Sequence, residues 1–598
     1  MKKIHFTITL FLLLVAVLYQ PAKNIYFENK RVQNEIYLQE YLSDKSFKRS
    51  YVKSLPKRLR PDLKNYHDFL MTRDPNTNSV PSEKVLDAIK FRDAKLNSRS
   101  YLDRKSEINW TERGPSSQAG RTRALMLDGN FNSNTKVWAA GVSGGLWTIT
   151  NISNASSEWT KVSDFWDTLN ITCVATDPTD SNVIYLGTGE KRGHGLKGFG
   201  IWKTSDGGST WNQLTSSTDF KWIDTIIVRE EGGVGVVYAG GGRSLSEGEY
   251  TGVNGLQKST DGGATWTEVL GEISAGSSHH VTDLELDSNN RLIVGTRTNT
   301  FGEGGGQIFY SDDGVIFSQI NTNALGTFDR TFVDVSPSDP NVLYAMFENA
   351  STGFITWLGK SEDGGDTWTQ KTIGVDENGN PFGDYQGSMD YWGFLGIDPN
   401  NPNTIFAAGA QSIHKSTDSG ETWTEISEWR GTGFSLPYVH ADHHNIVFID
   451  SDKIIVSNDG GVFLTTDGGS TFTMKNDNMV TTQFYSTAIH PTDSDYVLGG
   501  TQDNGTWKLN TAGKDAGVEV YGGDGGFVHI DQVNPDYQFG ATLYGNIFRS
   551  VNGGRSFGVY SDVTNADGTD AGFFINPSVI DGVNKAMYAT FDTASILR

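Results

Sequence analysis

The sequence contains a single cysteine, Cys173, among its 598 residues. One cysteine forms no disulfide within the chain and cannot build a cysteine-based zinc site. Hydrophobic residues make up only 36% of the chain, which excludes a helical bundle or a membrane protein with many spans. Aromatic residues reach 12%, and this argues against wholesale disorder because disordered chains are poor in aromatic side chains.

Glycine is abundant instead, at 69 of 598 residues, against a usual level of about 7%. Many glycines together with many aromatics predict an all-β protein of short strands joined by tight turns. The length suits several ordinary domains or one large repeat body.

Charge is distributed unevenly along the chain. The formal net charge is −22, but residues 1–107 carry +9 and the remainder −31. Phosphate binding requires clustered lysine and arginine, so the large acidic part excludes a nucleic-acid partner. The acidity favours solubility and is compatible with cation binding.

The first 107 residues differ from the rest. Lys2 and Lys3 precede a short apolar run, which predicts a signal peptide over 1–22 and no membrane span after cleavage; an uncleaved anchor is the alternative. Residues 23–107 are basic and poor in glycine, and they predict a helical lead segment with a helix start near Glu83. This segment fits a propeptide, a docking arm or a surface extension.

From Trp110 onward a phrase of about fifty residues recurs, in which apolar runs precede a polar turn that ends in an aromatic residue. The terminal aromatics between 159 and 472 lie 49 to 55 residues apart. Such a period with several strands per unit predicts a multi-bladed β-propeller. The seven clear turns are Thr204–Trp211, Ser259–Trp266, Tyr310–Phe317, Ser361–Trp368, Ser416–Trp423, Thr465–Phe472 and Ser550–Phe557.

Each turn places an acid where it can accept backbone N–H bonds, and a glycine two residues later where positive φ is needed. A residue repeated in every unit builds the unit rather than one site, so we interpret these acids as structural. They are Asp206, Asp261, Asp312, Asp363, Asp418 and Asp467, with Asn552 in the last turn.

These turns resemble the Asp-box of bacterial neuraminidase repeats. The resemblance implies that they lie on the outer rim, away from the ligand face. Sialidases themselves carry an Arg-Ile-Pro motif, which this sequence lacks.

The strand phrase occurs ten times, and two architectures fit. One is a seven-bladed propeller over 108–478 followed by an incomplete second propeller over 479–598; the other is a single ten-bladed ring. The first resembles the tandem-propeller glycoside hydrolases of the xyloglucanase type, and the second the ligand-binding domain of sortilin. We favour two propellers. The last strand phrase stops at Arg598 before its turn, so we expect the natural sequence to continue.

Residues that break the repeat are better site candidates than repeated ones. In "YVHADHHNIVFID", a strand would place His440, Asp442 and His444 on one face and His443 on the other. Such a face suits metal binding or proton relay, and we take Asp442 and His440 as candidate catalytic residues and His444 as a ligand-binding residue. A polar strand start is the alternative.

Three further acids follow strands in glycine-rich turns: Asp459, Asp503 and Asp524. Loops at one end of a propeller converge, so these acids could line a cleft or bind Ca²⁺. Ordinary Asp-Gly turns are the alternative, and no other cofactor is indicated.

Other candidates are Glu190, in a long glycine-rich loop, and Trp392, as a sugar-stacking platform. Near the start of the first blade, Arg113, Arg121 and Arg123 are expected to form closure salt bridges.

From Trp110 to the end, phrases such as "GVSGGLWT", "HADHH", "GTQDNGTW" and "GGDGGF" resemble secreted bacterial propeller proteins of sortilin-like and glycosyl-hydrolase-like kinds. The resemblance implies a protein, secreted or on a bacterial cell surface, that binds or processes an extracellular glycan. Xyloglucanases carry an acid where this chain has Ser143, and glycoside hydrolysis normally requires two carboxyls. A non-catalytic, protein-binding propeller of the sortilin type is therefore the alternative.

Overall fold

The computed structural model describes residues 73–74, 81, 83–96, 111–130, 135–163, 166, 168–190, 197–242, 244–246, 249–251, 255–384, 387–431, 433–562, 574–583, 586–590 and 596–597. The predicted signal peptide and most of the basic lead segment lie outside these residues. The described part is almost entirely β-structure, as the sequence predicted.

The chain separates into two compact units. The smaller one contains helix α4 (Glu83–Leu96), which begins where the sequence predicted a helix start, and Leu245–Thr251. The larger one contains the remaining sheets. No helix among the described residues is long and apolar enough to cross a membrane.

Seven four-stranded antiparallel sheets occupy the first part of the larger unit. The first four sheets are β1 (Thr122–Leu127), β2 (Val137–Gly141), β3 (Gly145–Ile149), β4 (Thr160–Lys161); β5 (Ile171–Asp177), β6 (Asp180–Thr188), β7 (Ile201–Thr204), β8 (Asn212–Gln213); β9 (Ile223–Glu231), β10 (Val234–Gly241), β13 (Gly255–Ser259), β14 (Thr267–Glu268); and β15 (His280–Leu286), β16 (Leu292–Arg297), β17 (Ile308–Ser311), β18 (Ser318–Ile320). The hairpin β11 (Ser244–Ser246) and β12 (Glu249–Thr251) is inserted between β10 and β13.

The next three sheets repeat the pattern. They are β19 (Phe328–Val335), β20 (Leu343–Asn349), β21 (Ile355–Ser361), β22 (Thr369–Gln370); β23 (Phe394–Ile397), β24 (Ile405–Ala408), β25 (Ile413–Ser416), β26 (Thr424–Glu425); and β27 (His443–Phe448), β28 (Ile454–Asn458), β29 (Gly461–Thr465), β30 (Thr473–Met474).

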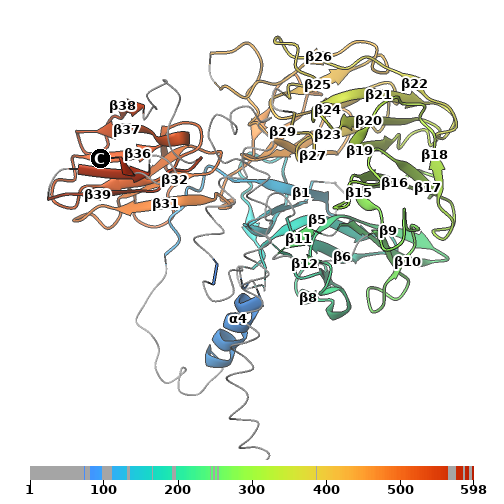
Figure 1. The fold of residues 1–598 in the computed structure, drawn as a ribbon, viewed down its shortest axis with the longest axis horizontal. Coiled ribbons are helices and arrows are strands. Elements are labelled where there is room, and N and C mark those ends of the chain that lie inside the picture. Colours follow the sequence, from blue (N-terminus) through green and yellow to red (C-terminus); the bar gives the residue numbers. More distant parts are fainter. Residues whose placement is uncertain are drawn as a thin grey trace, which may run out of the picture. The chain divides into compact units, whose positions relative to one another are not determined.

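The first strands of these seven sheets form a closed circle (Figure 1). Each packs against the first strand of the next sheet, and β27 packs against β1 and so closes the ring. Hydrogen bonds also join the first and seventh sheets near their outer strands: Trp159 Nε1 donates to Lys475 O at 2.6 Å, and Asn478 Nδ2 donates to Trp159 O at 2.7 Å. A single ten-bladed ring is excluded by this closure.

Three further sheets follow the ring in sequence. They are β31 (Phe484–Ile489), β32 (Val497–Thr501), β33 (Thr506–Leu509), β34 (Val518–Tyr521); β35 (Val528–Ile530), β36 (Gln538–Ala541), β37 (Asn546–Ser550), β38 (Gly558–Asp562); and β39 (Ser578–Asp581), β40 (Ala586–Thr590), β41 (Ile596–Leu597). The sheets of β31 and β35 pack on each other through Leu498, Val528 and Ile530.

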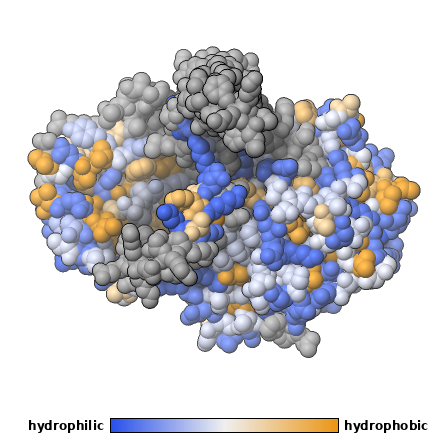
Figure 2. Space-filling view, turned by 90° about the horizontal axis from the view of Figure 1, so that it is seen from below, coloured by the Kyte–Doolittle hydropathy of each residue, from blue (hydrophilic) through white to orange (hydrophobic). Residues whose placement is uncertain are grey.

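Apolar side chains fill the space between neighbouring sheets. The middle strand β20 is buried from Leu343 to Glu348, and its Phe347 ring stacks on Trp357 of β21. Small residues permit this close approach: a Cβ on Gly187 would lie 2.4 Å from Cys173 Sγ. The alternation of bulky and small residues therefore sets the distance between strands. On the face shown in Figure 2, hydrophilic residues predominate and hydrophobic ones are scattered.

The seven polar turns connect the third and fourth strands of their sheets. In the turn at Asp261, Oδ1 accepts from Thr265 N at 2.9 Å and from Ser259 Oγ at 2.8 Å, while Oδ2 accepts from Thr265 Oγ1 at 2.6 Å. These bonds lower the pKa of Asp261 to about 2. The acid holds its own turn together, which supports the structural interpretation.

In one polar turn, the acid that accepts the backbone hydrogen bonds lies one residue later than the sequence analysis predicted. In the turn Tyr310–Phe317 the acceptor is Asp313, whose Oδ1 takes the backbone N–H groups of Val315 and Ile316 at 2.8 Å. Asp312 instead contacts Arg291 with an exposed side chain. The turn begins at Ser311 rather than Tyr310, so it is one residue shorter and the acid moves by one position.

We expect Asp261→Ala to lower the melting temperature by a few degrees, because the turn loses its acceptor. Asp261→Asn should change it much less, since Asn552 occupies the equivalent place and accepts from Ser556 N at 3.1 Å. Differential scanning calorimetry of both variants tests this. Equal effects of Ala and Asn would contradict it.

Two half-buried carboxyl groups join neighbouring first strands of the ring. Asp283 Oδ2 accepts from Val333 N at 2.9 Å, and Asp334 Oδ2 accepts from Ile397 N at 2.7 Å. Burial raises the pKa of Asp283 to about 6 and that of Asp334 to about 8, and the Asp283 carboxylate contributes to the second shift. These acids are therefore held partly or wholly protonated near neutral pH.

Asp334 should make stability depend on pH. The pKa of Asp334 is higher in the folded protein than in the unfolded chain. The stability that Asp334 contributes to the folded state is therefore fully present below about pH 4 and is lost as the pH rises towards 8. We expect Asp334→Asn to reduce the fall in melting temperature between pH 5 and 8. Asp261→Asn is the matched control, because that acid titrates below pH 4. An unaltered slope in Asp334→Asn would rule out this role.

Candidate functional site

The candidate acids gather at the end of the sheets opposite the polar turns. Asp459 lies in the connection between the second and third strands of its sheet, and so does Asp503. Asp442 and Asp524 precede the first strands β27 and β35. In an antiparallel meander these two kinds of connection lie at the same end, while the polar turns lie at the other.

The expected strand around His440 is shorter than predicted. Strand β27 begins only at His443, and Asp442 has φ of 65°. His440, Asp442 and His444 therefore do not share a strand face. They still approach the acids by other routes, because His440 Nε2 lies 3.0 Å from Asp503 O and His444 Nε2 lies 2.6 Å from Asp459 Oδ1.

Arg121 and Asp459 form the centre of the site. Arg121 Nε lies 2.9 and 2.8 Å from the two carboxylate oxygens of Asp459, and Nη2 lies 2.7 Å from Oδ2. The Asp459 side chain is fully buried. Burial alone would raise the pKa of Asp459, but Arg121 and the His444 hydrogen bond hold it far below its ordinary value. Asp459 is thus a permanent anion.

Asp503 shares the same guanidinium, but its pKa is shifted in the opposite direction. Arg121 Nη2 donates to Asp503 Oδ2 at 2.9 Å, and Asp503 N donates to Asp524 Oδ1 at 3.0 Å. Burial, followed by the charges of Asp524 and Asp459, raises the pKa of Asp503 well above its ordinary value. Its side chain is 20% exposed. A partly exposed carboxyl whose pKa is raised by burial and neighbouring acids is the arrangement used for general acid catalysis.

Calcium binding finds little support in this geometry. Oxygens of Asp442, Asp459 and Asp503 lie within 4.8 Å of one another, a spacing that suits a cation. However, both oxygens of Asp459 already accept from Arg121, and one also contacts His444. A cation would have to displace the guanidinium, so these residues do not fit Ca²⁺ well. We call Asp442, Asp459, Asp503 and Asp524 the acid cluster.

Of the three arginines expected to form closure salt bridges, Arg121 joins the first and seventh sheets of the ring, whereas Arg113 and Arg123 pair with acids of other sheets. Arg113 Nη1 contacts Asp495 Oδ1 at 3.0 Å, and Arg121 bridges two sheets through Asp459 and Asp503. Arg123 contacts Glu190 Oε2 at 2.9 Å. Glu190 is therefore an ion-pair partner of β1 and is not in the acid cluster.

Tyr391 and Trp392 do not form a sugar platform. Tyr391 is 4% exposed and Trp392 8% exposed, so neither presents an open ring face. The Tyr391 ring lies instead beneath Arg121 and Arg123, at 5.4 and 5.1 Å from the guanidinium carbons. The prediction for Trp392 was wrong because an isolated aromatic in a loop gives no sign of its burial.

Sequence reasoning missed Asp224 and His280. Asp224 lies 3.7 Å from Arg123 and 2.7 Å from His280 Nε2. Both stand at the start of first strands and belong to no recognisable motif. Only ring closure brings them to the same place as Arg123.

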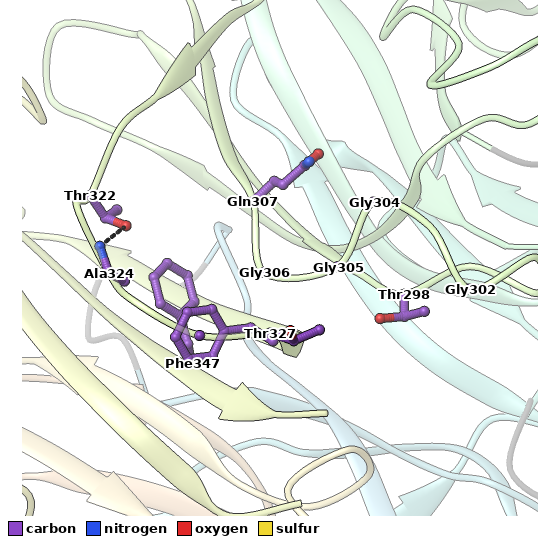
Figure 3. A pocket seen from close by; sticks show the side chains of 12 residues that line it. Thr298, Gly302, Gly304, Gly305, Gly306, Gln307, Thr322, Ala324, Thr327 and Phe347 are labelled. Carbon is purple, nitrogen blue, oxygen red and sulfur yellow. Dashed lines mark hydrogen bonds between the residues drawn. The ribbon is translucent and has the colours of Figure 1, made fainter. Parts of the chain in front are cut away.

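A separate cavity of about 370 Å³ lies between the connections Thr298–Gln307 and Thr322–Phe328 (Figure 3). Bare backbone at Gly304, Gly305 and Gly306 forms one wall, and the Phe347 ring is among the side chains that line the cavity. None of the residues predicted from the sequence lines it.

The chain is a β-propeller protein, and its sequence is similar to those of curated glycosyl hydrolases. A xyloglucanase from Paenibacillus sp. is 28% identical over 302 residues, which cover 46% of this chain and 29% of that protein. A xyloglucanase from Hypocrea jecorina is 26% identical over 396 residues, covering 60% of this chain and 43% of that protein. The chain thus matches less than half the length of these curated relatives. No family model matches.

A solved structure gives the same fold. An ancestral GH74 enzyme superposes with a TM-score of 0.55 over 81% of this chain and 69% of its own, at 14% sequence identity. At this identity the likeness establishes the propeller architecture alone.

Asp459→Ala should be strongly destabilising, because it leaves Arg121 and its buried charge without their main partner. We expect a loss of about 3–5 kcal/mol in the free energy of unfolding, the usual cost of breaking a buried ion pair. Denaturation followed by tryptophan fluorescence measures it.

Asp503→Asn is the matched control. It should lower the free energy of unfolding much less, because Arg121 still forms its ion pair with Asp459. The double variant Arg121→Met with Asp459→Leu should recover part of the loss, because neither charge remains buried. Similar losses for Asp459→Ala and Asp503→Asn would show that the pair is not the main support.

Proposed function

We propose that this protein binds and processes an extracellular polysaccharide of the xyloglucan class, with the acid cluster as its reaction site. The relatives named xyloglucanases support the substrate class. The observation that carries the proposal is Asp503, a carboxyl that is partly open to solvent, lies among other acids and has a raised pKa. We also propose that the protein is exported, in keeping with its short N-terminal apolar run.

Asp503 would act as the general acid. It gives its proton to the glycosidic oxygen while the bond from that oxygen to the anomeric carbon breaks. Asp442, an oxygen of which lies within 4.8 Å of an Asp503 oxygen, attacks the anomeric carbon and forms a glycosyl ester. A water molecule then gives its hydroxyl to that carbon and its proton to Asp503, which frees Asp442. Arg121 fixes the Asp503 carboxyl, and His440 contacts the backbone carbonyl of the same residue.

A second candidate is recognition without cleavage. Ser143 stands in the turn between β2 and β3, at the same end of the ring as the acid cluster. A hydroxyl cannot replace the carboxyl that the resemblance to xyloglucanases places there. A binding surface for a glycan, or for a protein ligand as in sortilin, would need no such acid.

A polysaccharide panel separates these functions. Xyloglucan, an unbranched β-glucan and a polyuronide are assayed for release of reducing ends and, by calorimetry, for binding. We expect xyloglucan to be cleaved, Asp503→Asn and Asp442→Asn to reduce release at least about 100-fold, and both to retain binding. His440→Ala should reduce release less, because it contacts only the backbone of Asp503.

Asp261→Asn, in a turn at the opposite end of the sheets, is the control and should leave both measurements unchanged. Binding without release would establish the recognition surface. Release that survives in Asp503→Asn would remove Asp503 from the mechanism, and absence of binding to every polysaccharide would refute the glycan class.

A further inference from the structure

Arg121 directly precedes β1, and Arg123, Arg297 and Arg330 lie in β1, β16 and β19; the first three of these four arginines have carboxylate partners. Arg121 pairs with Asp459, Arg123 with Glu190, and Arg297 with Asp329 at 3.1 Å. Arg330, on β19, is the exception. No carboxylate oxygen of the described residues lies within 4.0 Å of its guanidinium.

The contacts of Arg330 are neutral. Nη1 donates to Met389 O at 3.2 Å and to Trp392 O at 3.4 Å, and the guanidinium carbon lies 4.1 Å from the Phe332 ring centroid. Main-chain carbonyls satisfy hydrogen bonds but carry no net charge. The side chain lies deep in the ring and retains partial exposure, so N–H groups remain open to a further acceptor.

The electrostatic surroundings disfavour this cation. Burial, followed by the charges of Arg123 and Arg297, lowers the pKa of Arg330 to about 10. The nearest acids are engaged elsewhere: Asp224 contacts His280 at 2.7 Å, and Asp283 accepts from Val333 N and is partly protonated near neutral pH. A buried cation in this state is expected to recruit an anion.

We propose that the Arg330 guanidinium binds one small monovalent anion at the centre of the seven-sheet ring. A guanidinium offers two parallel N–H groups and pairs best with a carboxylate. The anion is either a free solute ion or the carboxylate of an acidic sugar, and both satisfy the same donors. The proposal does not rest on the polysaccharide function, because the hydrogen bonds of Arg330 go to Met389 and Trp392 and not to the acid cluster.

Two measurements test this site in the full-length protein. Crystals grown in sodium bromide should show an anomalous peak within hydrogen-bond distance of the Arg330 guanidinium. In solution, sodium bromide and sodium glucuronate should raise the melting temperature along a saturable curve at fixed pH. Arg330→Gln should raise the apparent Kd at least about tenfold, the effect of losing one charge-assisted hydrogen bond.

Arg291→Gln is the matched control. It removes the same charge from a surface arginine that contacts exposed Asp312, so it reproduces any general salt effect and should retain saturation. Arg330→Lys keeps the charge, so it should bind bromide more weakly than wild type but still give a saturable curve. This variant replaces Arg330→Gln in the test if Arg330→Gln does not fold. Equal responses of wild type and the Arg330 variants, or bromide bound elsewhere only, would overturn the proposal.

A uronic-acid oligosaccharide distinguishes the two sources. Retention by wild type and loss in Arg330→Gln would assign the site to a glycan carboxylate. Saturation by bromide and glucuronate without oligosaccharide binding would assign it to a free anion.

Discussion

The buried ion pair between Arg121 and Asp459 is the contact on which the rest of the site depends. It joins the start of β1 to the connection after β28, and so it ties the two sheets that close the ring. The same guanidinium reaches Asp503 in the next group of sheets. One side chain therefore closes the ring and holds the carboxyl that we place at the centre of the chemistry.

This arrangement explains why neighbouring carboxyls differ in protonation. Asp459 receives Arg121 and His444 and remains ionised despite complete burial. Asp503 receives one N–H of the same guanidinium but lies among other acids, and its pKa is raised. Different neighbours thus shift the pKa values of two aspartates in opposite directions, and the raised one is the proposed general acid.

Ionisable side chains lie at the centre of the ring, where a hydrophobic core would need none. Asp283 and Asp334 join first strands through backbone N–H groups at the cost of raised pKa values. Arg330 lies in the same region with only neutral contacts. The seven first strands converge on one axis, and this brings the polar side chains at their ends together. Replacing these side chains with hydrophobic ones would remove the groups that hydrogen-bond to loops such as Met389–Trp392.

The sequence by itself determined the repeat, the all-β class and the polar turns, because each depends on residues close together in the chain. Glycine and acid spacing specify a turn such as Ser259–Trp266 without help from elsewhere. Arg121, directly before β1, could be predicted as a closure partner, since a ring must join its ends. Tertiary structure alone decided that seven sheets close, that Trp392 is buried, and that His440 and Asp442 precede a strand. It also brought Asp503 to Arg121 across 382 positions, and no local pattern encodes a contact at that separation.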